Sequence, residues 1–464
     1  MAYNSVVFIF LFLPVFLGVY YMLPGIKAKN TALFVFSLFF YFWGAAWLVA
    51  LLPLTGLAAW FFSWLIVKTK FKRVFLTTAI LFFAGLLVYN KYLVFFIGTL
   101  MQLGMTGLHE VKTVSILGAS FFTFQAISYN MDVYRKEKRF EKNPLYVILY
   151  IAMFPQLLSG PLVRYHQMSL QMRERTTDWL LFAEGVRRFV KGLGKKVLIA
   201  DSLSFVVAQI VDNDQLVITP AVAWVCMVVF AIQIFFDFSG YTDMAIGVGK
   251  MLGFELPENF NYPYISTSIT EFWRRWHITF ATWIKEYIFT PLAIATRDIG
   301  KAGIFLSILI TFIICGLWHG PTWNFVAWGF VQGLFLGMEE LFLLKYLKRL
   351  KQFSVLYVLF LIVTCLVLFR TPDFAHAYRY YAFMFSPAAE GAHGLTAFFT
   401  TEHYVLLLAG IVLCVPFKWP EKLKIKDTRG IIPVVGDAAV IVVFLLSVMR
   451  LVTETFNPFI YFKF

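Results

Sequence analysis

The chain has 464 residues, of which 60% are hydrophobic and only 14% are charged. A soluble globular domain is roughly half apolar and about a quarter charged, so this composition excludes a soluble protein. The formal charge of +14 raises nucleic acid as a ligand, but the basic residues lie in short loops between apolar runs. The positive-inside rule predicts that distribution for cytoplasmic loops. We therefore expect a polytopic protein that contacts membrane lipids and binds no nucleic acid.

Apolar runs follow one another along the chain, and each is compatible with a membrane helix. They cover residues 6–23, 74–89, 221–236, 303–317, 356–368 and 404–415. Flanking residues extend the shorter runs toward the ~20 residues that cross a bilayer. Residues 31–67 carry no charge, which leaves room for two passes with a turn near Pro53 or Gly56. The sequence predicts an all-α fold of roughly eleven to thirteen spanning or embedded helices.

Common signals of processing and of metal binding are not found in the sequence. The N-terminus lacks the basic start and small-residue cleavage site of a signal peptide, so residues 6–23 are predicted to be the first span. The four cysteines lie in apolar stretches without paired short spacing, which indicates packing rather than a disulfide or zinc site. They are Cys226, Cys315, Cys365 and Cys414. No phosphate loop or metalloprotease motif occurs, and no metal is expected.

Two segments set the expected topology of a single membrane domain covering residues 1–464. In residues 165–201, apolar and basic side chains interleave, which is typical of a helix in the cytoplasmic interface that anchors the protein or contacts an anionic donor. Several basic residues lie in 418–429, and an apolar run follows at 431–451. Because basic loops stay in the cytoplasm, residues 452–464 are predicted to be extracytoplasmic.

His319 is the first candidate catalytic residue. It lies in Gly-Leu-Trp-His-Gly at 316–320, directly after an apolar run. An ionisable side chain at such depth is costly unless it lines a polar cavity. A histidine is mostly neutral at pH 7 and accepts a proton from a hydroxyl group that attacks an acyl carbon. Trp318 and Asn324 are expected to donate hydrogen bonds to the developing oxyanion. The structural alternative is a core histidine bonded to a neighbouring helix.

His277 closes a second stretch, Glu-Phe-Trp-Arg-Arg-Trp-His at 271–277, and has Trp276 beside it. On a helix, Glu271 is spaced to pair with Arg274 or Arg275. A nearby arginine disfavours imidazolium and keeps His277 neutral. The arginines are equally suited to bind phosphate. The structural alternative is an aromatic and basic anchor at the membrane interface.

A third stretch places two carboxylates and two hydroxyl groups directly after the apolar run 224–236, where a helix should still be embedded. They belong to Asp237, Ser239, Tyr241 and Asp243. Buried carboxylates need charged partners, and Arg274 or Arg275 are candidates. We expect a structural network here, with lining of a substrate channel as the alternative.

Together these stretches resemble the membrane-bound O-acyltransferase (MBOAT) family, and more closely its bacterial alginate O-acetyltransferase-like branch. Four blocks in order carry the resemblance, at residues 236–247, 268–278, 316–320 and 457–462. The stretches 8–24 and 160–164 are similar to that branch as well. The resemblance thus covers nearly the whole chain.

The resemblance implies a ring of tilted helices around a funnel or tunnel. His319 matches the family's catalytic histidine, and His277 matches the second histidine of bacterial members. The implied acyl donor is acetyl-CoA on the cytoplasmic side, with no permanently bound cofactor. Bacterial members pass the acyl group across the cytoplasmic membrane, where a separate extracytoplasmic acetyltransferase commonly completes transfer to polysaccharide.

The ending Phe459-x-Tyr461-x-x-Phe464 is similar to a tail proposed to carry the acyl group on its tyrosine. A phenol with a pKa of ~10 is a poor nucleophile unless a base such as His319 assists it. An aromatic anchor in the interface is the alternative.

These observations predict an O-acyltransferase that passes an acetyl group from cytoplasmic acetyl-CoA toward a surface or secreted polysaccharide. His319 is the expected base, and Tyr461 or an external hydroxyl is the expected acceptor. One alternative is D-alanyl transfer from a carrier protein to teichoic acid, although those proteins use a separate small polypeptide for the tyrosine tail. The other is a transporter or channel, but the inverted repeats common in such folds are not visible.

Overall fold

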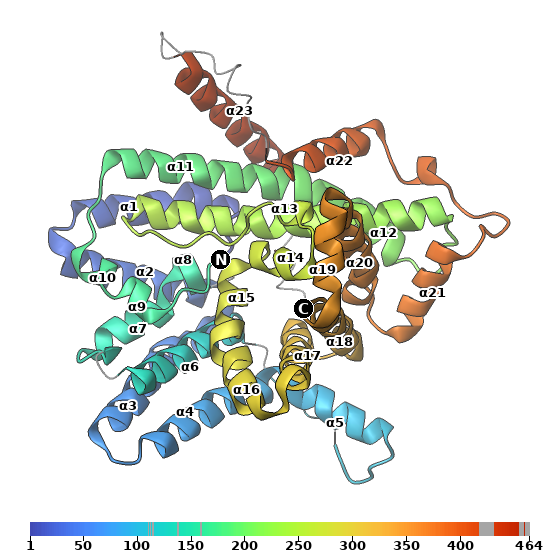
Figure 1. Cartoon of the computed structure of the whole chain (residues 1–464). Helices are drawn as coiled ribbons and strands as arrows, with labels where there is room; N and C mark the ends of the chain where they lie inside the picture. The colour runs from blue at the N-terminus through green and yellow to red at the C-terminus, as the bar shows by residue number, and fades with distance from the viewer. Residues whose placement is uncertain are drawn as a thin grey trace. The chain divides into compact units, whose positions relative to one another are not determined.

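The computed structural model describes residues 1–109, 111, 113, 116–136, 139–157, 160–416, 431–453 and 459. These residues form helices joined by turns and loops (Figure 1). Within those ranges the one extended pairing is an isolated bridge between Ile218 and His393. The predicted all-α fold is therefore confirmed.

Contacts between residues divide the chain into two compact units. Unit 1 comprises residues 1–186 and 245–257, and unit 2 comprises residues 187–244 and 258–464. Unit 1 contains α1 (Leu13–Met22), α2 (Gly25–Ala45), α3 (Leu51–Lys68), α4 (Lys72–Leu87), α5 (Leu93–Gln102), α6 (Ala119–Arg135), α7 (Pro144–Ala152), α8 (Phe154–Leu157), α9 (Tyr165–Met168) and α10 (Gln171–Glu174). Two helices contribute residues to both units, namely α11 (Trp179–Gly194) and α13 (Pro220–Met251).

Unit 2 contains all the predicted site residues. Its remaining helices are α12 (Ser202–Val211), α14 (Ile269–Arg275), α15 (Ile278–Ile284), α16 (Thr290–Ala295), α17 (Gly300–His319), α18 (Trp323–Met338), α19 (Leu344–Leu350), α20 (Ser354–Arg370), α21 (Phe374–Phe385), α22 (Thr401–Leu413) and α23 (Ile431–Thr453). Short π-helical turns continue several of these helices, including η5 (Lys195–Asp201) and η9 (Glu339–Leu343). The mixed apolar and basic stretch predicted at 165–201 thus becomes four short or medium helical elements, of which α11 is the longest.

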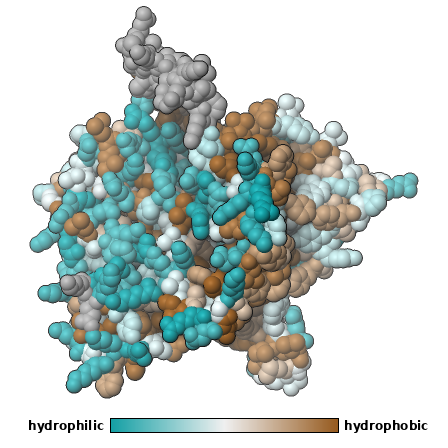
Figure 2. All heavy atoms as spheres, in the orientation of Figure 1, coloured by the Kyte–Doolittle hydropathy of each residue, from teal (hydrophilic) through white to brown (hydrophobic). Residues whose placement is uncertain are grey.

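Six helical stretches within the described ranges are long and apolar enough to cross a membrane. They are Gly25–Lys68, Lys72–Gln102, Pro220–Met251, Arg297–His319, Trp323–Arg370 and Val434–Thr453. Some of these stretches contain more than one helix, since Gly25–Lys68 alone has 44 residues, about twice what one span requires. Large apolar side chains also lie on the outside of the molecule, and in Figure 2 hydrophobic atoms gather where α19 and α20 lie in Figure 1. An exposed apolar surface of this kind suits contact with lipid.

The uncharged run 31–67 turns earlier in the chain than the sequence predicted. α2 ends at Ala45, a short 3-10 helix covers Ala46–Ala50, and α3 then begins at Leu51. Ala46 has a φ of 46° and a ψ of −128°, and this positive φ does not continue a right-handed helix. Pro53 lies in the first turn of α3, where the missing N–H costs no helical hydrogen bond. The predicted turn near Pro53 or Gly56 is therefore wrong.

The backbones of α17 and α18 approach each other closely in unit 2. A Cβ atom on Gly316 would lie 2.1 Å from the carbonyl oxygen of Phe325, and one on Gly329 would lie 2.3 Å from the carbonyl oxygen of Phe312. Gly333 and Gly337 continue the glycine stripe of α18 at four-residue intervals. Small residues at this spacing let two membrane helices pack backbone to backbone. The contact fixes His319, which is the last residue of α17.

A buried carboxylate holds the start of α14. Glu339, with no exposed surface, accepts hydrogen bonds from the backbone N–H groups of Ile269 (2.7 Å) and Thr270 (2.9 Å). The hydroxyl of Ser268 accepts from the next N–H, that of Glu271, at 3.0 Å. The first N–H groups of a helix have no partner inside it, and a negative charge there is stabilising. Glu339 therefore anchors α14, which carries Trp273 toward the site.

We predict that Gly329→Ala destabilises the protein by about 1–3 kcal/mol, because the added methyl group forces α17 and α18 apart. Gly436→Ala is the matched control, since a Cβ atom on Gly436 in α23 would meet nothing within 4 Å. Thermal unfolding in detergent measures both variants. Equal losses in the two variants would contradict the proposed backbone contact.

We predict that Glu339→Ala lowers the free energy of unfolding by at least about 2 kcal/mol, because buried N–H groups of α14 lose their acceptor. The neighbouring residue Glu340 is exposed, so Glu340→Ala should change stability by no more than about 0.5 kcal/mol. Denaturation in mixed micelles compares the two. If both variants were equally stable, Glu339 would have no role in capping α14.

Candidate functional site

His319 lies at the C-terminal end of α17, surrounded by aromatic rings. The centroid of its ring lies 4.8 Å from Trp318, 5.0 Å from Phe369 and 5.1 Å from Trp328. Only 6% of the residue is exposed. Gly320 follows immediately, and a Cβ atom there would lie 2.3 Å from the Phe325 ring. Glycine at this position therefore lets the chain turn from α17 into α18 against that ring.

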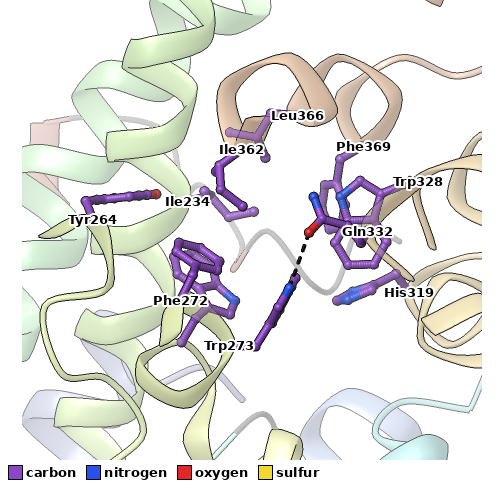
Figure 3. A pocket seen from close by; sticks show the side chains of 11 residues that line it. Ile234, Tyr264, Phe272, Trp273, His319, Trp328, Gln332, Ile362, Leu366 and Phe369 are labelled. Atoms are coloured by element: carbon purple, nitrogen blue, oxygen red, sulfur yellow. Dashed lines mark hydrogen bonds between the residues drawn. The ribbon is translucent and has the colours of Figure 1, made fainter. Parts of the chain in front are cut away.

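A small pocket lies against the His319 side chain (Figure 3). Its walls come from α13, the 263–265 turn, α14, α17, α18 and α20. The lining residues are Ile234, Tyr264, Phe272, Trp273, Trp276, His319, Trp328, Gln332, Ile362, Leu366 and Phe369. A mostly apolar pocket with few polar groups is typical of a small-molecule site.

The polar groups of the pocket come from facing helices. In Figure 3 the His319 ring lies beside Trp328 and Gln332 of α18, and Trp273 of α14 approaches from the opposite side. The indole N–H of Trp273 donates to Oε1 of Gln332 at 3.2 Å. This bond joins α14 to α18 next to the histidine. The arrangement can hold a small group beside an imidazole while apolar walls exclude water.

His277 does not line this pocket. It lies between α14 and α15, where its φ is 45° and its ψ is 53°, a left-handed conformation that is uncommon for residues other than glycine. Its Nδ1 lies 3.1 Å from Oδ1 of Asn259. Burial lowers the pKa of His277 to about 3. The ring is therefore neutral, as predicted, but because of burial rather than because of an arginine.

Aromatic rings connect the two histidines. The ring of Phe280 stacks on His277 at 5.0 Å and on Trp318 at 4.1 Å. Trp318 in turn contacts His319. The two stretches 271–277 and 316–320 thus meet in one aromatic cluster of unit 2, although they lie on different helices.

The carboxylates of α13 pair with residues of α11 and η5. Lys196 Nζ lies 2.7 Å from Oδ1 of Asp237 and 2.6 Å from Oδ1 of Asp201. Asp243 pairs with Lys195 at 2.7 Å and with Arg188 at 2.5 Å. A structural network at this position is what the sequence predicted. The predicted partners, Arg274 and Arg275, are wrong.

Those two arginines have other surroundings. Arg275 pairs with Glu271 at 2.8 Å across one helical turn, which confirms that part of the prediction. Arg275 also donates to the backbone carbonyl of Asn261 at 3.1 Å. Arg274 is exposed. Trp276, their neighbour, stacks on Phe272 at 5.6 Å and lines the pocket.

Asn324 is turned toward the loop after α20. Its amide Nδ2 donates to the carbonyl oxygen of Thr371 at 3.0 Å and to Oγ1 of the same residue at 3.1 Å. These donors therefore support the fold beside His319. Trp318 stacks on Phe280 within the aromatic cluster, and neither side chain lines the pocket.

Phe459, a described residue near the end of the sequence, packs against α13. Phe459 has no exposed surface. Its ring stacks on Tyr241 at 4.6 Å and contacts Phe238 at 5.5 Å. Phe238 also contacts the His277 ring at 4.6 Å. Tyr461 lies outside the described residues.

Several residues of the site were missed in the sequence. Gln332 is a polar residue in the middle of the apolar helix α18, and Asn259 lies in the loop before α14. Glu339 is a carboxylate that follows directly after the end of α18. Gln332 and Glu339 lie within or at the end of an apolar run, the same signal that singled out His319, whereas Asn259 lies in a polar loop that carries no such signal. The glycine stripe of α18 was also readable from its spacing.

Comparison with known proteins gives the site its context. The profile of MBOAT, the membrane-bound O-acyltransferase family, matches residues 38–346. The chain is 34% identical to a probable alginate O-acetylase of Azotobacter vinelandii, with all of both chains covered. It is 33% identical to a peptidoglycan O-acetyltransferase of Helicobacter pylori over 73% of this chain and 70% of that one. A teichoic acid D-alanyltransferase of Bacillus subtilis is 28% identical over 49% of this chain and 60% of its own length.

These relatives are named as enzymes of acyl transfer, which favours an enzyme over a transporter or channel. The match covers the helices that carry His277 and His319. The apolar helical stretches agree with a multi-pass membrane protein. The chain is therefore an O-acyltransferase that belongs to the membrane-bound O-acyltransferase family.

Proposed function

We propose that this protein moves an acetyl group from acetyl-CoA at the cytoplasmic face of the bacterial inner membrane toward a polysaccharide outside. The observation that carries the proposal is the His319 ring beside a small, mostly apolar pocket. An alginate O-acetylase and a peptidoglycan O-acetyltransferase among the relatives support acetyl as the group and a glycan as the acceptor.

In the proposed reaction His319 is the general base. A hydroxyl oxygen attacks the thioester carbonyl carbon while its proton passes to the imidazole. The C–S bond then breaks, and the leaving thiolate takes up the proton. An acetyl group is small, and the apolar walls of the pocket suit its methyl group. Exclusion of water by those walls favours transfer over hydrolysis of the thioester.

The C-terminal tail is the proposed first acceptor. Phe459 is buried against Phe238 and Tyr241, which supports a tail held by the fold. Tyr461 follows two residues later, and two residues span at most about 7 Å of chain. The acetyl group on its phenol then passes to a separate extracytoplasmic acetyltransferase, which acts on the sugar hydroxyls.

The proposed orientation of the chain in the membrane is based on the distribution of its basic residues. Basic residues at 418–429 keep that loop in the cytoplasm, so the tail lies outside. The proposed arrangement is a ring of helices, eleven to thirteen in number, around a funnel, with residues 165–201 in the cytoplasmic interface. A basic helix at that interface also suits an anionic donor.

D-alanyl transfer is the second candidate function, favoured by the similarity to a teichoic acid D-alanyltransferase. That similarity covers 49% of the chain, whereas the similarity to the alginate O-acetylase covers all of it. Acetyl transfer is therefore the better supported function.

His319→Ala should lower acyl transfer from radiolabelled acetyl-CoA by at least about 100-fold, because the hydroxyl nucleophile loses its base. The control is His393→Ala, since His393 is an exposed histidine of the same unit. Transfer by purified protein in nanodiscs measures both variants. An unaffected His319→Ala variant would disprove the proposed mechanism, and transfer of D-alanine in place of acetate would disprove the donor.

Tyr461→Phe should abolish acetylation of the tail and of the polysaccharide, because the nucleophilic oxygen is removed while the ring is kept. Phe459→Ala should reduce both partially, since the tail loses a buried ring worth about 3–5 kcal/mol. Phe353→Ala is the control, because that ring is 77% exposed. Mass spectrometry of the C-terminal peptide detects the acetyl group. Full polysaccharide acetylation by Tyr461→Phe would exclude the relay.

A further inference from the structure

His277 carries a polar atom that the described fold does not use. The residue is 2% exposed, and its Nε2 atom has no hydrogen-bond partner among the described residues. Leaving such an atom unpaired costs about 1–3 kcal/mol, and unpaired buried atoms are exceptions in native proteins. Nε2 is therefore an enclosed acceptor whose partner is not among the described residues.

Asn259 determines which nitrogen of His277 carries the proton. Its Oδ1 accepts from the backbone N–H of Thr279 at 3.2 Å and lies 3.0 Å from the hydroxyl of the same residue. The reverse orientation of the amide would set its NH₂ group against that N–H, so the oxygen faces Thr279. The same oxygen lies 3.1 Å from Nδ1 of His277. Nδ1 must then be the donor, and the proton is on Nδ1.

The backbone around His277 is held in the same way. The carbonyl oxygen of Asn259 accepts from the N–H of Ile278 at 2.9 Å. Between these bonds His277 keeps its left-handed φ of 45°. Such conformations outside glycine persist where the surroundings enforce them, and they cluster at ligand sites. The loop that contains Asn259 is itself held at the preceding residue, because Arg188 donates to both carboxylate oxygens of Glu258 at 2.9 and 2.6 Å.

We infer that Asn259 holds His277 as the Nδ1–H tautomer, which makes Nε2 a fixed hydrogen-bond acceptor whose ligand is a hydroxyl group. The rings of Phe238, Phe280 and Trp318 surround the imidazole at 4.6 to 6.2 Å. An apolar wall of this kind disfavours a charged donor. A neutral O–H group is the donor that fits, and this identification rests on the proposed acyl transfer to hydroxyl groups.

The two histidines then have different tasks. Because burial lowers the pKa of His277 to about 3, its Nε2 accepts a hydrogen bond but is too weak a base to take the proton at neutral pH. It orients the hydroxyl, and Asn259 is the positioning residue behind it. Proton transfer stays with His319.

Two hydroxyl groups with the same hydrogen-bonding chemistry are candidate donors to Nε2 of His277. One is the phenol of the chain's own tail, since Phe238 contacts both His277 and Phe459. The other is an alcohol of the bound polysaccharide. In either case the O–H hydrogen points at Nε2 before the reaction, and the hydroxyl turns this single hydrogen to His319 when its oxygen attacks.

Nitrogen-15 NMR of the full-length protein in nanodiscs tests the tautomer. The protein is labelled at histidine, and the His277 signals are assigned by their loss in His277→Gln. We expect a pyrrole-type signal for Nδ1 and a pyridine-type signal for Nε2. Asn259→Ala should release the proton to Nε2, whereas Asn261→Ala, at an exposed asparagine, should change nothing. A proton on Nε2 in the unmodified protein would overturn the inference, even if Asn259→Ala does not fold.

The same signal identifies the hydroxyl. A shift of the Nε2 resonance in Tyr461→Phe assigns the donor to the tail. A shift on adding alginate oligosaccharides to that variant assigns it to the sugar. An Nε2 signal that is unchanged in both experiments would overturn the hydroxyl ligand.

Measurements of acyl transfer distinguish the loss of the Nε2 hydrogen-bond acceptor from the loss of the His277 side-chain volume. His277→Gln places a carbonyl oxygen near the position of Nε2, so it should keep at least a tenth of the acyl transfer that His277→Ala loses. Equal activity of the two variants would argue against an acceptor. If the unmodified protein transferred no acyl group, the proposed function would fail while the tautomer result stood by itself.

Discussion

A polar group buried in a protein that faces lipid has to find its partner within the chain, and this constraint organises the site. Hydrocarbon offers no water to an N–H group or a carboxylate, and an unpaired group there is costly. Glu339 meets the constraint by capping α14, and Lys196 meets it by pairing with Asp201 and Asp237. These contacts hold the elements around the pocket at fixed positions. Nε2 of His277 is one of several buried atoms that depart from this constraint, and it points to a ligand because Asn259 fixes its role as an acceptor.

The close contact of α17 and α18 adds a second requirement. Without side chains at Gly316 and Gly329, the two backbones meet, and the turn between the helices fixes the His319 ring beside Trp328. The aromatic wall formed by Phe369 and Trp318 then surrounds the ring. In the proposed mechanism, a rigid base in a water-poor pocket favours acyl transfer over the reaction of the thioester with water.

Much of the fold and the main site were predictable from the sequence. Apolar runs gave the helices, and the burial of His319 followed from its place at the end of one run. The pair of Glu271 and Arg275 followed from helical spacing alone. The partners of Asp237 and Asp243 did not, because they come from α11 and η5, whose packing against α13 no local spacing encodes. The neutrality of His277 was predicted from a nearby arginine, but burial causes it.

The turn after α2 shows the same limit on a smaller scale. Proline is a good marker of a helix start as well as of a turn, and the sequence around Pro53 does not separate the two. Ala46, which ends the helix with a positive φ, has no side chain that announces it. Local chemistry therefore predicted that the run breaks, whereas the position of the break depends on packing.

The buried ring of Phe459 has a consequence for kinetics. In the proposed relay, a tail that is part of the enzyme meets its active site as an intramolecular partner, with an effective concentration of about the millimolar order that short tethers give. A separate acceptor polypeptide would have to find the enzyme by diffusion in the membrane and would compete with other partners. The covalent tether also fixes one acceptor to each active site. Supply of the acceptor is thus independent of the expression level of a second gene product.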